Sequence, residues 1–371
     1  MDNNPVDMFF IYKLPRQADH KSSCVQKGQG FLYMDSRDKR WRLSEVCVGE
    51  PNQPVAYTLE QLYRDKSSKT NIMYALFNDH HPPKKRGGRG TLDGSRAHSK
   101  RVYYFDDQQG YIFIHSVPKF PPLNGYEYPS SGEVNGQSMM CVTLKTDEET
   151  MLEIGRTLYT MQPSLYARRL TDEFASAFKI DKDSDLSRAL NRKSVTVKER
   201  AKKARRVTHL TSKAGVPIVS FDKHRTWRNI HPTADLYSDL IAPELHTDFI
   251  VETYLRTRSV DLSSGCVADH RGYKAYNARA ISTDDVADLA FTSTRDHSKW
   301  AVAAEPVEPY VCVSGINREE SQTRRGGGAI CVEDEDFWKA YREVVSKVER
   351  CGGNTAGDDA DDVLPAPIGA G

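Results

Sequence analysis

The sequence predicts a mixed α/β fold made of two similar halves, and three observations support this prediction. Short apolar stretches split by polar turns make residues 5–123 rich in strands. Helical periodicity and capping signals appear from residue 146 onward. A tripeptide recurs in the second half at the same distance from the same kind of strand. The length of 371 residues suits one large two-part fold.

The first part of the chain contains apolar stretches of strand length and one helical segment. The expected strands are residues 8–12, 31–34, 71–77, 102–105 and 111–114. Polar residues separate them, as is typical of strands joined by turns. The helix is expected at residues 58–65. We therefore expect this part to form a sheet with a helix beside it.

Helix signals are clearer further along the chain. Thr146 and Glu149 form a capping box, in which both side chains satisfy free backbone donors, and predict a helix to about residue 159. Two more helices are expected at residues 235–245 and 334–350. The last has Phe337, Tyr341, Val344, Val345 and Val348 on one face. After it, residues 352–371 contain four acids and no base, and we expect this tail to be disordered.

Composition excludes several classes of protein. Apolar residues make up 38% of the chain and charged residues 28%, which indicates a globular protein with a sizeable core. The longest apolar runs are far shorter than the roughly 18 residues of a membrane span, so no transmembrane segment is predicted. The start lacks the features of a signal peptide, and the sequence assigns no compartment. The eleven histidines form no His-x-x-x-His pattern near a carboxylate, so neither a metal site nor a cofactor is predicted.

Positive charge is concentrated locally, although the net charge is only +1. Residues 84–101 hold seven bases against one acid, and residues 192–206 hold eight bases against Glu199. Either segment could contact a polyanion, or could be a solvated loop or helix face. The first segment adjoins the repeat described next, which favours the polyanion there.

The repeat is His98-Ser99-Lys100, which recurs as His297-Ser298-Lys299. In both copies ten residues follow the lysine, and then a strand signal starts at Tyr111 or Tyr310. Because the spacing is identical, we infer an internal duplication. We place the halves at residues 1–165 and 166–351.

The repeat predicts a phosphate site. If each copy starts a strand, His and Lys point to the same face, and duplication brings two such pairs together. Two imidazoles and two ammonium groups then offer a nucleophile, a proton donor and positive charge, which is what cleavage of a phosphodiester without a metal requires. The alternative is a pair of structural histidines beside solvated lysines.

The paired His-x-Lys motif resembles the phospholipase D superfamily, although Phe105 and Ala304 stand where that motif has an Asp. The resemblance implies a phospholipase D-like fold of two pseudo-symmetric α/β/α halves with central mixed sheets. Polar support could come from His115 and Ser116 in the first half and from Ser314 and Asn317 in the second.

Further segments are similar to deoxyribonuclease II, in the same order. They include Leu76-Phe77-Asn78-Asp79, His115-Ser116-Val117-Pro118, Asn135-Gly136-Gln137-Ser138, Asp296-His297-Ser298-Lys299-Trp300, Gly315-Ile316-Asn317-Arg318 and Arg325-Gly326-Gly327-Gly328. The first His-Ser-Lys copy departs from that family, since Ala97 and Arg101 flank it where glycines are usual.

This resemblance implies an endonuclease that cuts double-stranded DNA at acid pH without a metal and leaves 3′-phosphate and 5′-hydroxyl ends. Its catalytic residues would be His98, Lys100, His297 and Lys299. One histidine would form a phosphohistidine while the other protonates the leaving oxygen; the sequence does not decide which, and we favour His98 as the nucleophile. We expect DNA to bind Lys84, Lys85, Arg86, Arg89, Arg101 and Arg325.

The resemblance also concerns cysteines, assembly and location. It implies disulfides Cys312–Cys331 and Cys266–Cys351 and leaves Cys141 free and buried. It is compatible with a homodimer and indicates an acidic or extracellular compartment.

Two other functions are considered beside the nuclease. A phospholipase D-type enzyme or another phosphodiesterase would need an apolar surface near the pocket, whereas this chain places bases there. A DNA-binding module without catalysis would not need to retain all four His and Lys residues.

Overall fold

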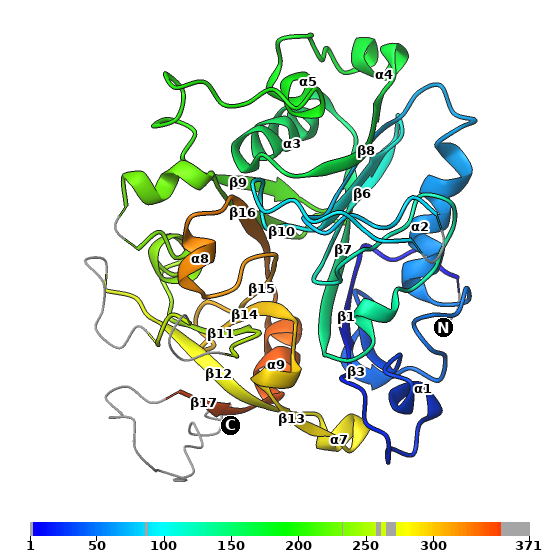
Figure 1. Ribbon diagram of the computed structural model, residues 1–371, viewed down its shortest axis with the longest axis vertical. Helices are drawn as coiled ribbons and strands as arrows, with labels where there is room; N and C mark the ends of the chain where they lie inside the picture. Colours follow the sequence, from blue (N-terminus) through cyan, green and yellow to red (C-terminus); the bar gives the residue numbers. More distant parts are fainter. Residues whose placement is uncertain (1–2, 86–87, 232, 257–260, 265–271, 350–371) are drawn as a thin grey trace.

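The computed structural model describes residues 3–85, 88–231, 233–256, 261–264 and 272–349 (Figure 1). Two large sheets dominate it, and the predicted mixed α/β class is confirmed. The strands of the first sheet, in spatial order, are β3 (Asp38–Leu43), β2 (Phe31–Asp35), β1 (Met8–Lys13), β7 (Gln137–Lys145), β6 (Gln109–His115), β5 (Arg101–Phe105), β4 (Met73–Phe77) and β8 (Leu165–Leu170). All of these neighbouring strands pair antiparallel.

The second sheet repeats this order. Its strands are β13 (Ala290–Thr292), β12 (Ala275–Ser282), β11 (Phe249–Thr253), β14 (Lys299–Ala303), β15 (Tyr310–Ser314), β16 (Gly327–Glu333), β10 (Pro217–Lys223) and β9 (Arg205–Thr211), with β17 (Val345–Val348) beside β12. Only the β11–β12 pair is parallel among the described strands. The series β2-β1-β7-β6-β5-β4-β8 thus corresponds to β9-β10-β16-β15-β14-β11-β12.

The register of the strands matches as well as their order. Arg101, which follows the first His-Ser-Lys copy, pairs with Ile114, and Trp300, which follows the second copy, pairs with Val313. The two copies therefore occupy equivalent places in the two sheets. The division at residue 165 remains a prediction, and β8 still belongs to the first sheet.

The helices cover the sheets and lie between them. They are α1 (Ser23–Gln26), α2 (Pro54–Asp65), α3 (Glu148–Met161), α4 (Asp172–Ala177), α5 (Asp185–Leu190), α6 (Ala242–Glu244), α7 (Asp284–Ala287), α8 (Glu320–Thr323) and α9 (Glu335–Glu343). Short 3₁₀ turns are η1 (Ser130–Gly132), η2 (Arg225–Asn229) and η4 (Ser293–Arg295), and η3 (Tyr237–Ile241) is a π-helical turn.

One continuous apolar core joins the two sheets. Phe10 of β1 contacts Phe337 of α9, with ring centroids 4.7 Å apart, and Tyr12 meets Trp300 of β14 edge-on. A second core lies on the other face of the first sheet, where α2 buries Val55, Leu59 and Leu62 (Figure 1). The halves therefore share apolar surface, and separating them would expose it to water.

Three predicted helices differ from the structure. The first begins after Asp147, whose carboxylate, and not the Thr146 hydroxyl, accepts from the amide of Thr150. The segment 235–245 forms the π turn η3 and the single turn α6, with Pro243 inside the latter. The segment 334–350 is helical only to Glu343, because its valines continue as strand β17 against β12.

Candidate active site

The two His-Ser-Lys copies lie just before or at the start of equivalent strands, β5 and β14. Both lysines are buried, and both histidines keep a small exposed fraction. Each histidine is within electrostatic reach of the opposite copy, since Lys299 acts on His98 and Lys100 acts on His297. The structure therefore brings the four residues into one cluster.

The backbone of each histidine is bonded to the opposite half of the chain. The amide of His98 donates to the carbonyl of Gly326, at 2.8 Å. The amide of His297 donates to the carbonyl of Gly136, at 2.9 Å. Gly136 precedes β7 and Gly326 precedes β16, which are equivalent strands. These crossed hydrogen bonds hold the two His-Ser-Lys segments against each other.

The imidazole rings are oriented through their Nδ1 atoms. His98 Nδ1 is hydrogen-bonded to the carbonyl of Gly315, and a carbonyl can only accept, so Nδ1 carries the proton. His297 Nδ1 lies 3.2 Å from Oε1 of Gln137, which also accepts from the Ser116 hydroxyl. Among the described residues, neither ring forms a hydrogen bond at Nε2.

Asp79 supplies a carboxylate to the cluster, although the His-x-Lys motif has no Asp at its usual distance in this sequence. It follows β4, and its Oδ1 accepts from Lys100 Nζ at 2.6 Å. Its Oδ2 lies 3.6 Å from His98 Nε2 and 3.5 Å from a guanidinium nitrogen of Arg325. Burial opposes the charge, but Lys100 and His98 outweigh it and hold the pKa of Asp79 far below its usual range. Asp79 therefore stays ionised at acid pH.

Tyr254 takes the equivalent position in the second half. Phe77 pairs with Arg101 and Glu252 pairs with Trp300, so the residues two positions later, Asp79 and Tyr254, correspond. The Tyr254 ring meets the His297 ring edge-on, with centroids 4.7 Å apart. Its φ of 41° is uncommon for a bulky residue and is of the kind that clusters at functional sites.

Of these two residues, the sequence pointed only to Asp79. Asp79 ends one of the segments similar to deoxyribonuclease II, but it lies 19 residues before His98 in the chain. Tyr254 lay in no segment that we singled out. Only the pairing of β4 with β5 and of β11 with β14 brings them to the histidines.

The electrostatics of the cluster favour the neutral forms of both histidines and of Lys299. Burial, followed by Lys100, lowers the pKa of His98 to about 3, although Asp79 acts in the opposite direction. Burial and Lys299 lower the pKa of His297 well below its usual value. Burial and Lys100 lower the pKa of Lys299 to about 7. An anion such as a phosphodiester would relieve this crowding of positive charge.

The four predicted supporting residues lie around this cluster. His115 is fully buried and accepts at Nδ1 from the amide of Val117. Ser116 orients Gln137, as described above. Ser314 donates to the carbonyl of Gly328, and Asn317 is almost buried in the loop after β15. Their roles toward phosphate remain predictions.

Arg101 cannot contact DNA, so this part of the predicted DNA surface is wrong. Its side chain is fully buried and donates to Asp222 of β10 at 3.3 Å and to Tyr103 at 3.0 Å. Strand alternation turns it away from Lys100 and into the core between the sheets. It is a structural tie between the halves.

Replacing Arg101 with methionine is expected to destabilise the fold by about 3–5 kcal/mol, because it leaves a buried Asp222 carboxylate without its partner. Urea unfolding at pH 7 measures this change. The control is the double variant Arg101→Met with Asp222→Leu, which removes both charges and should regain most of the loss. A cost below about 1 kcal/mol for the single variant would contradict the prediction.

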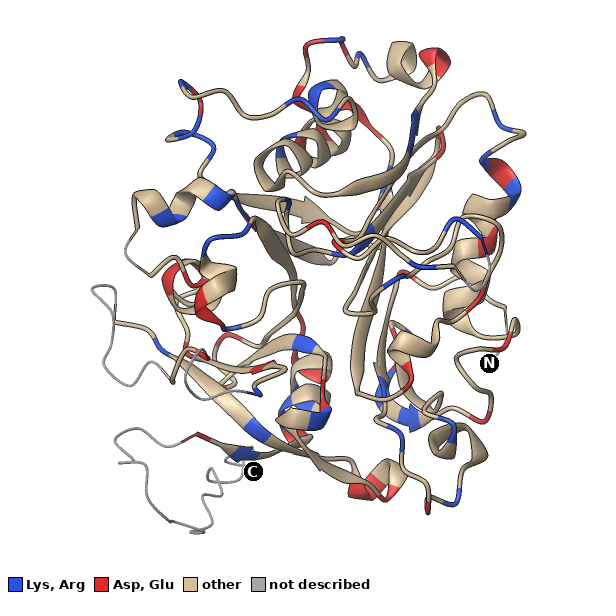
Figure 2. Ribbon diagram, viewed as in Figure 1, with Lys and Arg blue, Asp and Glu red and all other residues tan. Residues whose placement is uncertain are grey.

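The other predicted DNA-binding residues are placed differently. Lys84, Lys85 and Arg89 are exposed in the loop between β4 and β5, whereas Arg86 lies outside the described residues. Arg325 is partly exposed and joins the cluster through Asp79. The second basic run, residues 192–206, leads into β9 and is largely exposed. Along the rest of the chain, basic and acidic residues are interspersed (Figure 2).

The cysteines form one predicted and one unpredicted bridge. Cys312 and Cys331 face each other across β15 and β16 and form a disulfide, as expected. Cys141 is free and buried, also as expected. Cys24 and Cys47 form a second disulfide that we did not predict, since nothing in their spacing marks them. The predicted pair of Cys266 and Cys351 lies outside the described residues.

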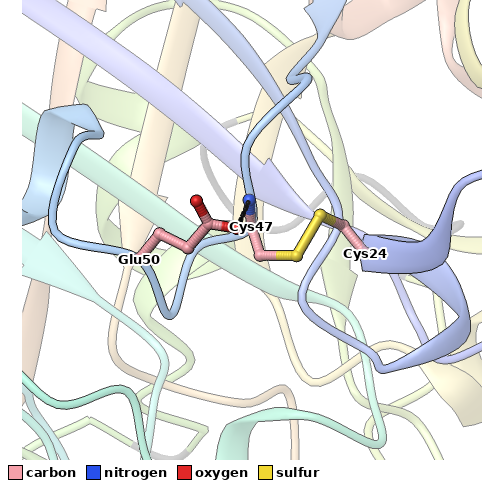
Figure 3. Close-up of side chains that lie close together, drawn as sticks. All are labelled: Cys24, Cys47 and Glu50. Atoms are coloured by element: carbon pink, nitrogen blue, oxygen red, sulfur yellow. Dashed lines mark hydrogen bonds between the residues drawn. A yellow bond between two sulfur atoms is a disulfide. The ribbon is translucent and has the colours of Figure 1, made fainter.

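The Cys24–Cys47 disulfide is part of a cluster that resembles a metal site. Cys24, Cys47 and Glu50 are the one cluster of possible metal ligands within the described residues. Figure 3 shows that the two sulfurs are bonded to each other, with Glu50 next to the amide of Cys47. Metals bind the thiolate and not the disulfide, so this cluster lacks two of its three ligands.

Comparison with known proteins decides the family. The family model for deoxyribonuclease II matches residues 1–351. The chain belongs to the deoxyribonuclease II family. Deoxyribonuclease-2-alpha of Mus musculus is 31% identical over 350 residues, which cover 94% of this chain and 91% of that protein. Plancitoxin-1 of Acanthaster planci is 32% identical over 358 residues, with 94% and 90% covered.

Membership of the deoxyribonuclease II family makes the chain a hydrolase that cleaves DNA. Cell-death-related nuclease 7 of Caenorhabditis elegans is also similar, 30% identical over 95% of this chain and 87% of that protein. In the described part of this deoxyribonuclease II family member, no helix is long and apolar enough to span a bilayer.

Proposed function

We propose that this protein is an acid endodeoxyribonuclease that cleaves double-stranded DNA through a phosphohistidine, without a metal ion. The observation that carries the proposal is the placement of two imidazoles in one cationic cluster, each with Nδ1 occupied and Nε2 left to react. One ring can then bond to phosphorus while the other handles the proton. Lys100 and Lys299 neutralise the charge that develops on the phosphoryl oxygens.

In the first step His98 Nε2 bonds to phosphorus, and the bond from phosphorus to the 5′-oxygen breaks. The leaving oxygen takes a proton from the His297 imidazolium, whose pKa the negative charge of the bound phosphodiester raises again. In the second step a water oxygen bonds to phosphorus, its proton passes to His297, and the bond from phosphorus to His98 breaks. The products are a 3′-phosphate and a 5′-hydroxyl, and both histidines return to their starting states.

The asymmetry between Asp79 and Tyr254 supports His98 as the nucleophile. A phosphorylated imidazole that keeps its Nδ1 proton has a positively charged ring. The Asp79 carboxylate lies close to the His98 ring and would stabilise that charge. Tyr254 offers His297 no such carboxylate. The low pKa of His98 also keeps its ring neutral, and therefore nucleophilic, in mild acid.

The test is cleavage of plasmid DNA at pH 5 in excess EDTA. We expect full activity, because every group in the proposed steps belongs to this chain. The product ends should accept phosphate from polynucleotide kinase without prior phosphatase treatment, since the 5′ ends are hydroxyls. Loss of cleavage in EDTA with recovery in magnesium would replace this mechanism by a metal-dependent one.

A further inference from the structure

Two buried lysines lie outside the His-Ser-Lys copies and have no part in the steps above. Lys13 ends β1 and Lys223 ends β10, and both side chains are fully buried. Among the described residues neither ammonium has a carboxylate within ion-pair distance. Burial lowers the pKa of Lys13 well below its usual range and that of Lys223 to about 7. Such burial is costly, so their contacts need an explanation.

Both ammonium groups donate to backbone carbonyls of a loop. Lys13 Nζ donates to the carbonyl of Glu133, at 2.9 Å, and to that of Asn135. Lys223 Nζ donates to the carbonyls of Gln322, at 3.0 Å, and Thr323, at 2.8 Å. Each lysine therefore fixes the segment just before a central strand, β7 in the first half and β16 in the second.

The two lysines occupy equivalent positions of the duplicated sheets. Lys13 pairs with Gln137, and Lys223 pairs with Gly327. The residues before these partners are Gly136 and Gly326. Their carbonyls accept the amide hydrogens of His297 and His98, as described above. Each lysine is thus one short loop away from the histidine of the opposite half.

We propose that Lys13 and Lys223 are positioning residues for the catalytic histidines, and that they act crosswise. Lys13 holds the loop whose Gly136 carbonyl fixes His297, and Lys223 holds the loop whose Gly326 carbonyl fixes His98. The catalytic role of the histidines in this inference rests on the proposed function. The geometric part stands on the hydrogen bonds alone.

A lysine suits this task because one long side chain reaches two carbonyls from inside the sheet. Gly326 has no room for a side chain that could hold the loop, since a Cβ on it would lie 2.4 Å from the carbonyl oxygen of Met161. A Cβ on Gly136 would lie 2.4 Å from Oδ1 of Asp296. The loops therefore approach the opposite half so closely that they are held by lysines of their own half, from the neighbouring strands β1 and β10.

The experiment compares Lys13→Met and Lys223→Met with the wild type in two assays. We expect kcat on DNA to fall by about 10²-fold with KM little changed, because a small misplacement of a reacting group is enough for such a loss. The second assay follows the ring signals of ¹³C-labelled histidines by NMR over a pH titration, with assignments from His98→Ala and His297→Ala. Lys13→Met should move the titration of His297, and Lys223→Met that of His98.

The control is Lys39→Met, which removes the 2.6 Å ion pair between Lys39 of β3 and Asp334, the N-cap residue of α9, and so weakens another contact between the halves. It should leave kcat and both titrations unchanged. Lys13→Gln and Lys223→Gln keep an N–H donor and should show the same crossed pattern more weakly, which keeps the test usable if a Met variant does not fold.

The crossed pattern decides the outcome. Equal changes of both histidines in either variant, or a change of the histidine in the same half, would overturn the proposal. Unchanged titrations with unchanged kcat would also overturn it. The titrations need no substrate, so they remain informative even if the phosphohistidine mechanism fails the test with EDTA.

Discussion

Replacing His98 or His297 with alanine is expected to abolish cleavage of DNA without unfolding the protein. General acid catalysis contributes about 10²-fold or more, and removing the nucleophile loses more still. The two histidines act as one unit, so the double variant should be hardly slower than either single variant. Rates on plasmid DNA at pH 5 measure these losses, and circular dichroism verifies the fold. More than about a tenth of the activity in either variant would contradict the assignment.

The two alanine variants should differ on a substrate that needs no general acid. In thymidine 3′-(4-nitrophenyl phosphate), 4-nitrophenoxide takes the place of the 5′-linked nucleoside as leaving group and departs without being protonated. His297→Ala should then release a burst of nitrophenol equal to the enzyme and stall, since the base for the second step is missing. His98→Ala should release none. The opposite result would make His297 the nucleophile.

The pH profile of the enzyme should show a maximum in mild acid. His98 must be neutral to attack, and its pKa of about 3 sets the lower limit. Two groups must be protonated at the upper limit. They are the His297 imidazole, whose pKa burial and Lys299 lower well below its usual value, and the Lys299 ammonium, which is lost as the pH rises through about 7. We therefore expect the optimum of kcat/KM between roughly 4.5 and 6, below the usual pKa of histidine. An optimum above pH 7.5 would contradict this model of the site.

Removing either catalytic lysine should lower the rate and move the optimum upward. In the proposed mechanism Lys100 and Lys299 stabilise charge in the transition state, so Lys100→Met and Lys299→Met should each cost about 10²–10³ in kcat. Both cations also lower the pKa of the histidines, and without one of them those values rise. The control is Lys39→Met, which should keep the wild-type profile. A downward shift of the optimum in either catalytic variant would exclude the proposed electrostatics.

The sequence predicted the parts of the site that repeat along the chain. The spacing after Lys100 and Lys299 predicted two equivalent strands, and β6 and β15 begin near or at the expected tyrosines. Strand periodicity also predicted that His and Lys point to one side of each sheet. These features depend on neighbours in the chain, which is why patterns of short range are sufficient for them.

Contacts between distant residues were beyond such patterns. Arg101 is a basic residue beside basic neighbours, and only its burial against Asp222 shows that it belongs to the core. The pattern of valines after Glu343 fits a helix as well as a strand. They form a strand because they pair with β12. Cys24 lies in α1 before β2 and Cys47 follows β3, and the antiparallel pairing of β2 with β3 brings these two segments together, which no spacing rule reveals.

The difference between Asp79 and Tyr254 has a consequence for the origin of such a site. Two identical subunits related by a twofold axis would give their two histidines the same surroundings, and nothing would decide which one attacks and which one donates the proton. In a single chain the two copies are free to differ. Here one equivalent position became a carboxylate and the other an aromatic ring. Under the duplication inferred from the repeat, fusion of the halves thus allows the two histidines to take the different roles that we propose for them.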